Sequence, residues 1–374
     1  MQDSSKGRRA LVDASRLIIE SMARAGADAF IGYPITPANL LYQYGSQRMP
    51  LMLAAPDEIT TLQWMAGLAA AGKLPITATS FPGYALMIES VNMAYMMELP
   101  MVIILVQRLG PATGTATCGA QGDLSLLRGN ISGGHPIPVL CTSSFADCWT
   151  LGAKAVETAI RLRTPVVLLT SKEEVMTTKS FDLNSLPEIE KVERKYYDLQ
   201  CGGKYKSYKA TDLVPDFLPV TQNQHQVRLN ASTHDKEGIL QHSNEEAMAN
   251  TRRLEDKIRM KLPDYLEYEY HQEKDAQTLV VAFGISAAAA KDAVAELEKA
   301  GEKVSLLIPK TLLPVPEVYL EIMDHYKKVV VAEENINNQF SDMYYGIRKP
   351  EHHRFMGALG KMITPQQIIQ EVLA

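Results

Sequence analysis

The sequence of 374 residues has few cysteines, and none of them stands in a metal-binding pattern. The four are Cys118, Cys141, Cys148 and Cys201, and no pair shows the C-x-x-C spacing typical of zinc, redox or cluster ligation. We therefore interpret them as ordinary thiols of a reduced protein. Any iron-sulfur centre that the protein uses is expected on another chain.

An excess of positive charge and long apolar runs are also lacking. Lys and Arg number 38 against 43 Asp and Glu, a formal net charge of -5, so there is no basic field for nucleic acid or for an anionic membrane. The longest strongly apolar stretch, Leu99 to Val106, is far shorter than the roughly 20 residues that span a bilayer. Near the N-terminus, Asp13, Arg16 and Glu20 interrupt any signal-peptide core. We expect a cytoplasmic protein with no nucleic-acid partner and no membrane span.

Four common catalytic motifs are missing as well. The sequence contains no G-x-G-x-x-G after a first strand, no G-x-x-x-x-G-K-[ST], no G-x-S-x-G and no H-E-x-x-H. The eight histidines cluster only at His352 and His353, whose adjacent side chains diverge on most backbones. We interpret this pair as solvated and expect no metal site on it.

Short apolar runs alternate with helical patterns, which predicts a mostly parallel α/β sheet. In the first part, strands are expected at 29–33, 51–55, 76–79, 101–106 and 165–169, and helices at 11–25, 56–72, 84–98 and 148–163. Gly26 is expected to end the first helix in a left-handed conformation. A second α/β unit has expected strands at 278–284, 304–308 and 328–333, with a helix at 287–300. The predicted division is 1–185, a connecting segment 186–275 with partial structure, and 276–374.

Three stretches follow expected strands directly, at the edge where open α/β sheets bind ligands. They are 32–37, 56–58 and 107–114. Arg108 offers a bidentate clamp for a carboxylate, and Thr36 offers a hydroxyl in a rigid turn. The alternative is a structural turn with an interdomain ion pair. Likewise, Glu58 is either a functional carboxylate or a first-turn residue that complements the helix dipole.

In combination, these stretches resemble the alpha subunit of 2-oxoacid:ferredoxin oxidoreductases over nearly the whole chain. The resemblance is closest to the 2-oxoglutarate type with a separate gamma chain. It rests on motifs in the family's order: Tyr33-Pro34-Ile35-Thr36-Pro37, Asp57-Glu58-Ile59, Thr79-Ser80-x-Pro82-Gly83, Val106-Gln107-Arg108-x-Gly110-Pro111-x-Thr113-Gly114, Gln121-x-Asp123-Leu124, Ser232-Thr233-His234-Asp235, Pro309-Lys310-Thr311-Leu312-x-Pro314 and Ile363-Thr364-Pro365.

The resemblance implies a fold and a cofactor. The first domain resembles the pyrimidine-binding domain of thiamine diphosphate enzymes, a parallel sheet with helices on both faces, and the second resembles the transketolase C-terminal domain. Glu58 matches the glutamate that hydrogen-bonds the cofactor's aminopyrimidine and so activates it, which makes it the expected catalytic residue. Pro34 and Ile35 are expected to contact the same half of the cofactor.

The resemblance also implies substrate contacts. Arg108 and Thr36 are expected to orient the carboxylate or the 2-oxo group of the substrate, and Thr117 is a weaker candidate for the same pocket. Asp235 matches a family stretch, but it is equally well interpreted as a turn residue.

A missing cofactor-binding motif indicates that the protein needs a partner subunit. The sequence has no Gly-Asp-Gly followed by an Asn about 25 to 30 residues later, the motif by which thiamine enzymes hold Mg²⁺ and the diphosphate. A beta subunit is therefore expected to supply the diphosphate site, the Mg²⁺ and a [4Fe-4S] cluster, with the active site at the interface. The family implies gamma and ferredoxin-like delta subunits, ferredoxin as electron acceptor and coenzyme A as co-substrate.

Some positions depart from the pattern of 2-oxoglutarate enzymes. Phe81 replaces a usual Gly, and Leu109, Ala112 and Ala120 stand at variable positions around the arginine motif. Pyruvate, branched-chain and aryl 2-oxoacids therefore remain open as substrates. Two other functions also remain: a non-redox thiamine decarboxylase or transketolase half, and a non-catalytic scaffold subunit.

Overall fold

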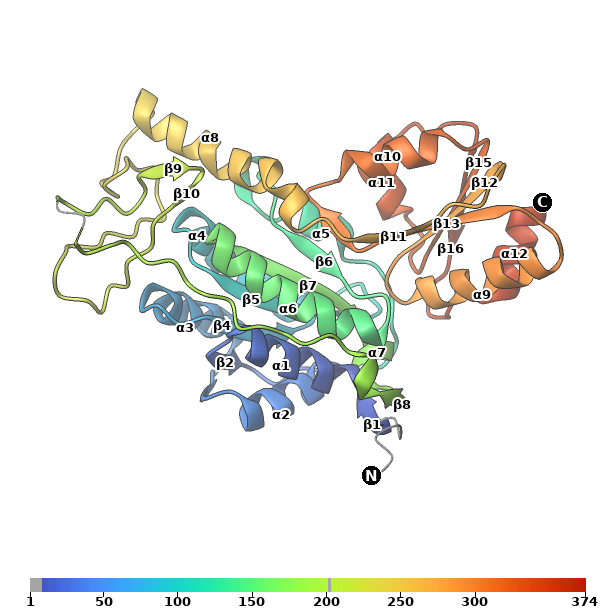
Figure 1. The fold of residues 1–374 in the computed structure, drawn as a ribbon, viewed down its shortest axis with the longest axis horizontal. Helices are drawn as coiled ribbons and strands as arrows, with labels where there is room; N and C mark the ends of the chain where they lie inside the picture. Colours follow the sequence, from blue (N-terminus) through green and yellow to red (C-terminus); the bar gives the residue numbers. More distant parts are fainter. Residues whose placement is uncertain (1–8, 201–202) are drawn as a thin grey trace, which may run out of the picture.

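A computed structural model describes residues 9–200 and 203–374 of the chain, and a seven-stranded sheet forms the centre of its larger part (Figure 1). Every pair of neighbours in this sheet is parallel except the antiparallel edge pair β14 and β6. Across the sheet, the strands are β14 (Thr311–Leu313), β6 (Val139–Cys141), β7 (Pro165–Ser171), β5 (Met101–Gln107), β4 (Pro75–Thr79), β2 (Ala29–Gly32) and β3 (Leu51–Ala54).

Helices cover this sheet because its central strands have no polar face. All seven residues of β5 are buried, and so are all seven of β7, which is typical of a parallel strand covered on both sides. Helix α1 packs along α6, and α3 packs along α4. The helices of this part are α1 (Ala14–Ala25), α2 (Asn39–Arg48), α3 (Glu58–Ala70), α4 (Phe81–Met96), α5 (Leu124–Arg128), α6 (Phe145–Leu162) and α7 (Lys172–Met176).

A five-stranded sheet forms the second part, on the right in Figure 1, with the C-terminus beside it. Its strands are parallel except for the edge strand β11, which runs antiparallel to β13. In order they are β11 (Tyr268–His271), β13 (Val304–Pro309), β12 (Thr278–Ala282), β15 (Lys328–Glu333) and β16 (His353–Gly357). The helices of this part are α9 (Ser286–Lys299), α10 (Glu317–Asp324), α11 (Gln339–Tyr345) and α12 (Pro365–Leu373).

Smaller elements lie outside the two sheets. They are the antiparallel pairs β1 (Arg9–Asp13) with β8 (Thr178–Asp182) and β9 (Ala210–Asp212) with β10 (Val214–Pro215), helix α8 (Glu245–Met260), and the 3-10 turns η1 (Ser132–Gly134), η2 (Leu183–Ser185) and η3 (Leu262–Asp264). Strand β11 lies inside the segment 186–275, and β14 lies inside 276–374, yet each joins a sheet of the neighbouring region. The three-part division of the chain stays a prediction.

The predicted alternation is confirmed, with corrections at individual elements. The expected helix start at Leu11 is wrong: Leu11 lies in β1 and is 72% exposed, and the helix begins after Asp13, whose carboxylate accepts from the backbone of Arg16 at 3.1 Å. Gly26 ends α1 at φ 117°, as expected. No helix in the described part of the chain has the length and apolarity that a bilayer crossing requires. The first eight residues and Cys201 lie outside the described ranges, and Cys118, Cys141 and Cys148 are free thiols.

A buried ion network joins α8 to the end of α4. Glu98 is fully buried, and its carboxylate accepts from Lys257 at 2.6 Å and from Arg253 on α8. Lys257 also donates to the carbonyl of Arg163 at 3.3 Å. Burial alone would raise the pKa of Glu98, but Lys257 and Arg253 outweigh it and lower the pKa to about 2. The network therefore holds the connecting region against the first sheet by paired rather than isolated buried charges.

Glu98→Gln is expected to lower the free energy of unfolding by about 3 to 5 kcal/mol, because it leaves two cations buried without their carboxylate. Urea denaturation would measure this loss. Glu255→Gln is the matched control, since Glu255 lies on α8 and pairs with Arg259 at the surface, where a loss of no more than about 0.5 kcal/mol is expected. Equal losses in both variants would contradict the role of the network.

The difference between wild type and Glu98→Gln is expected to depend on pH. Because the pKa of Glu98 is lower in the folded chain than its ordinary value of 4.5, the stabilising contribution is complete above pH 4.5. It is lost as the pH falls through about 2, below which the carboxylate is protonated in both states. Repeating the urea titrations at several acidic pH values measures this convergence, and a constant difference would contradict it.

Candidate functional site

Four parallel strands end at one edge of the seven-stranded sheet, and the loops that follow them carry most of the predicted residues. The first loop follows β2: Tyr33 and Pro34 are exposed, and Ile35 and Thr36 are half-buried. Thr36 Oγ1 accepts from the Asn39 side chain at 3.2 Å. The sequence predicts these residues in a loop at a strand's carboxyl end, and the structure places them there.

Arg108 follows β5 directly and reaches the Thr36 loop. Its Nη1 donates to the backbone carbonyl of Thr36 at 2.6 Å, so the structure brings these two predicted residues together. The contact uses the carbonyl, whereas the sequence indicated only the hydroxyl. Arg108 is 7% exposed, and its Nε is buried and has no hydrogen-bond partner. Arg108 is thus a buried cation with donor capacity left over.

Asp123 shares the surroundings of Arg108, and sequence reasoning gave it no role. It is 4% exposed, and its Oδ2 lacks a hydrogen-bond partner. Burial raises the pKa of Asp123 to about 7, against the opposing effect of Arg108. Burial also lowers the pKa of Arg108, while Asp123 raises it. In the sequence, the only indication of such a role is that Asp123 is the acidic residue of the Gln121-x-Asp123-Leu124 motif.

Glu58 begins α3, directly after the N-cap residue Asp57, whose carboxylate accepts from the backbone of Thr60 at 2.7 Å. Glu58 is 6% exposed, and among the described residues none donates a hydrogen bond to its carboxylate. Gly83 lies against it: a Cβ there would stand 2.5 Å from Glu58 Oε1 and 2.2 Å from Thr79 Oγ1. A larger residue at position 83 would therefore displace Glu58 or Thr79, whereas glycine leaves the carboxylate in place with its acceptor capacity open.

The other two candidates are less closely tied to this edge. Thr117 is exposed on the loop that follows Arg108. The Asp235 carboxylate accepts from the backbone of Glu237 at 2.9 Å, from the backbone of Ile239 at 3.0 Å and from the Gln241 side chain at 2.9 Å. Burial raises the pKa of Asp235, but these donors outweigh it and lower the pKa below its ordinary value. These hydrogen bonds match the alternative interpretation of Asp235 as a turn residue.

Histidines and carboxylates gather elsewhere without forming part of this edge. His353 is 8% exposed and bonds Ser341 Oγ through Nε2 at 2.6 Å, so half of the expected solvated pair is in fact buried. Within the described ranges, one group of three metal-ligating side chains occurs, formed by His271, Glu273 and Glu298 on the second sheet. A hydrogen bond of 2.8 Å between His271 Nε2 and Glu298 Oε1 accounts for the closeness of these two side chains.

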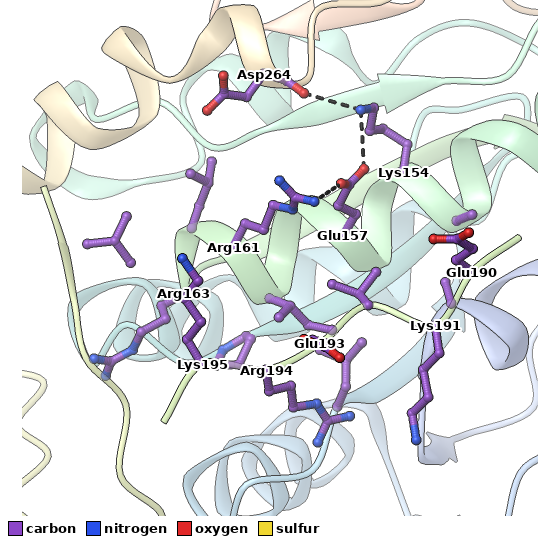
Figure 2. Close-up of a pocket in the computed structure, with 18 of the residues that line it drawn as sticks. Lys154, Glu157, Arg161, Arg163, Glu190, Lys191, Glu193, Arg194, Lys195 and Asp264 are labelled. Carbon is purple, nitrogen blue, oxygen red and sulfur yellow. Dashed lines mark hydrogen bonds and ion pairs between the residues drawn. The ribbon is translucent and has the colours of Figure 1, made fainter. Parts of the chain in front are cut away.

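A groove of about 1080 Å³ lies at the opposite edge of the first sheet, and Figure 2 shows residues that line it. Leu74 and Pro100, which precede β4 and β5, line it together with the end of α6 and the segment 187–195. Three of its charged side chains pair with one another, since Glu157 bonds Lys154 at 3.2 Å and Arg161 at 2.7 Å. The groove is therefore separate from the edge that carries Glu58 and Arg108.

Comparisons with known proteins agree on one family. The model of "pyruvate flavodoxin/ferredoxin oxidoreductase, thiamine diP-bdg" matches residues 20–253, and that of "pyruvate:ferredoxin oxidoreductase core domain II" matches 276–368. The 2-oxoglutarate synthase subunit KorA of Methanocaldococcus jannaschii is 29% identical, with 94% of this chain and 95% of that protein covered. The ketoisovalerate oxidoreductase subunit VorB of Methanothermobacter thermautotrophicus is 28% identical, with 97% and 96% covered.

Solved structures extend the comparison to the fold. The 2-oxoglutarate:ferredoxin oxidoreductase from Magnetococcus marinus, with 2-oxoglutarate, coenzyme A and succinyl-CoA bound, matches at a TM-score of 0.91 and 26% identity, over 100% of this chain and 66% of that one. A split-gene transketolase matches at a TM-score of 0.53 and 13% identity, which concerns the fold alone. The predicted α/β fold class is confirmed. The chain belongs to the pyruvate flavodoxin/ferredoxin oxidoreductase family, as an alpha-type subunit of the thiamine diphosphate-dependent 2-oxoacid:ferredoxin oxidoreductases.

Proposed function

We propose that this chain binds the aminopyrimidine half of thiamine diphosphate and the substrate carboxylate in a complex that oxidatively decarboxylates a 2-oxoacid, 2-oxoglutarate being favoured. The observation that carries the proposal is the Glu58 carboxylate, which is buried, has no donor within the described residues and lies beside Gly83. A carboxyl group that no donor occupies at this sheet edge can share a proton with a ring nitrogen of the pyrimidine. Thiamine diphosphate supplies the carbon nucleophile of such reactions when it is bound.

Each predicted residue has a role in this proposal. Glu58 hydrogen-bonds the ring and holds a proton there, and Pro34 and Ile35 contact the same half of the cofactor. Arg108 binds the substrate carboxylate with the nitrogens that its bond to Thr36 leaves over. Thr36 helps to orient the substrate. Thr117, which is exposed on its loop, is a weaker candidate for the same pocket.

Asp235 remains proposed as a contact near the substrate, supported by the family resemblance. Its carboxylate is already occupied by three local hydrogen bonds, so it would act by shaping its turn. Within this scheme, the turn rather than the free carboxylate approaches the substrate.

A beta subunit is proposed to complete the site with the diphosphate pocket, Mg²⁺ and a [4Fe-4S] cluster, since this sequence lacks the Gly-Asp-Gly motif. Exposed apolar side chains on α3 and α4, the helices next to Glu58, support a partner there: Ile59, Trp64, Leu86 and Met93 are 44%, 41%, 51% and 36% exposed. We further propose gamma and ferredoxin-like delta subunits, ferredoxin as electron acceptor, coenzyme A as co-substrate, and a cytoplasmic location.

A branched-chain 2-oxoacid is the second candidate substrate. Relatives named as ketoisovalerate oxidoreductase subunits are as similar to this chain as several of the 2-oxoglutarate synthase subunits. Leu109, Ala112, Ala120 and Phe81, which depart from the 2-oxoglutarate pattern, leave room for a different pocket.

Glu58→Gln is expected to lower 2-oxoacid-dependent electron transfer by the assembled complex on the order of 100-fold or more, because the amide cannot hold the proton on the ring. The rate of reduction of a viologen dye measures this loss, and thiamine diphosphate content is determined in parallel. Glu296→Gln, an exposed change on α9, is the control and should keep full activity. Full activity in Glu58→Gln, or a native complex without thiamine diphosphate, would sink the proposal and favour a scaffold role.

Arg108→Ala is expected to raise KM for the 2-oxoacid roughly 10- to 160-fold, since a charge-assisted pair contributes about 1.5 to 3 kcal/mol. Initial rates over a range of 2-oxoglutarate and ketoisovalerate concentrations measure it and also rank the two substrates. Arg128→Ala, which removes an exposed arginine from nearby α5, should leave KM unchanged. An unchanged KM in Arg108→Ala would reject the clamp.

A further inference from the structure

The loop after β5 is closed on itself by backbone hydrogen bonds. Leu109 N donates to the carbonyl of Cys118 at 2.8 Å, and Thr115 N donates to the carbonyl of Leu109 at 3.0 Å. The two ends of the loop therefore lie side by side, and Arg108 is covalently next to one of them. A displacement of the Cys118 end is passed directly to the residue beside Arg108.

Beyond Cys118, the loop is fastened to the second sheet through Gln121, which is fully buried. The Gln121 side chain donates to the carbonyl of Phe283 at 2.7 Å and accepts from Glu334 N at 2.8 Å and Ser286 Oγ at 3.1 Å. Its backbone N donates to the carbonyl of Glu334 at 2.9 Å, and its carbonyl accepts from the Asn335 side chain at 2.9 Å. All of these partners belong to the second part of the chain, which therefore holds Gln121 through both its side chain and its backbone.

Neighbouring residues reinforce the attachment on both sides. Gly119 N donates to Glu173 Oε1 at 3.0 Å, which ties the loop to the first sheet. Gln339, on α11, accepts from Ser125 N and donates to the carbonyl of Gly122, both at 2.9 Å. Gln121 is the only one of these whose side chain makes three hydrogen bonds across the boundary between the sheets.

We propose that Gln121 is a positioning residue for the substrate: it anchors the loop of Arg108 to the second sheet, which thereby sets the place of the guanidinium. The path runs from Gln121 to Cys118, and from Cys118 through Leu109 to Arg108. The inference rests on the proposed function, in which Arg108 binds the substrate carboxylate. Residues 276–374 carry none of the predicted catalytic or substrate-binding residues. In this proposal they nevertheless affect substrate affinity, because they hold Gln121.

The effect should fall on binding rather than on turnover. Glu58 stands on α3, after β3, and its position depends on Asp57, Thr79 and Gly83 rather than on the loop of Arg108. Loss of the Gln121 anchor therefore shifts the group that holds the substrate and leaves the group that serves the cofactor in place. A misplacement of about 1 Å in a positioning group can lower catalytic efficiency by about 100-fold.

Gln121→Ala in the assembled complex is expected to raise KM for the 2-oxoacid about tenfold or more, with kcat within about twofold of wild type and thiamine diphosphate content unchanged. Lys310→Met is the matched control. Lys310 Nζ donates to Asp147 Oδ1 on α6 at 2.5 Å, so the change removes a mostly buried contact between the two parts of the chain without touching Gln121 or its partners. Its KM should stay at the wild-type value.

Ser286→Ala provides a milder variant, for use if Gln121→Ala does not assemble. It removes one of the three side-chain bonds of Gln121 and is expected to raise KM by a smaller factor. Arg108→Ala is measured in the same series. If Arg108→Ala leaves KM unchanged, the proposed substrate clamp fails, and this inference with it.

If Arg108→Ala raises KM but the Gln121 and Ser286 variants do not, the clamp stands and the positioning role is overturned. A rise of the same size in Lys310→Met would also overturn it, because a general loosening of the boundary would then explain the result. A rise confined to the Gln121 and Ser286 variants supports it.

Discussion

The parallel alignment of β2, β3, β4 and β5 is the constraint on which the candidate site depends. Residues far apart in the chain meet because each follows the carboxyl end of one of these strands. The hydrogen bond between Arg108 and Thr36 closes the gap between two of the loops. The central strands β5 and β7 are buried on both faces, so close packing restricts their movement. The first residues of the loops are therefore held in fixed positions. The candidate site residues thus lie in short loops, and the packed sheet below them fixes where these loops begin.

The alternation of strands and helices was readable from hydrophobic periodicity, and so was the location of Glu58 and Arg108 after strands. Short elements were not: β14 has three residues inside a proline-containing turn, and its partner β6 is equally short. Leu11 fits a helical pattern, but pairing with β8 decides its conformation. Local patterns also cannot show that Thr36 is used through its carbonyl, or that Gly83 makes room for Glu58. Contacts of this kind depend on tertiary approach.

Buried charge is handled in two different ways in this chain. At Glu98, one carboxylate is shared by two cations, which makes the pairing structural and complete. At the sheet edge, Arg108 and Asp123 are both buried and both keep a polar atom without a partner. Incomplete pairing of buried ionisable groups is costly in a purely structural setting and is common where a ligand is bound. The fully paired Glu98 network therefore has a structural role, whereas the incompletely paired Arg108 and Asp123 are typical of a binding site.

Strand β14 has a consequence for the order of folding. It comes from the region of the second sheet, yet it completes the edge of the first by pairing with β6. On a ribosome, nearly all of the first sheet is synthesised long before residue 313 emerges. Until then the edge of β6 is open to strand addition by other chains. The first sheet is consequently complete only after residues 311–313 have been added, and until then the short length of β6 limits the edge that is exposed.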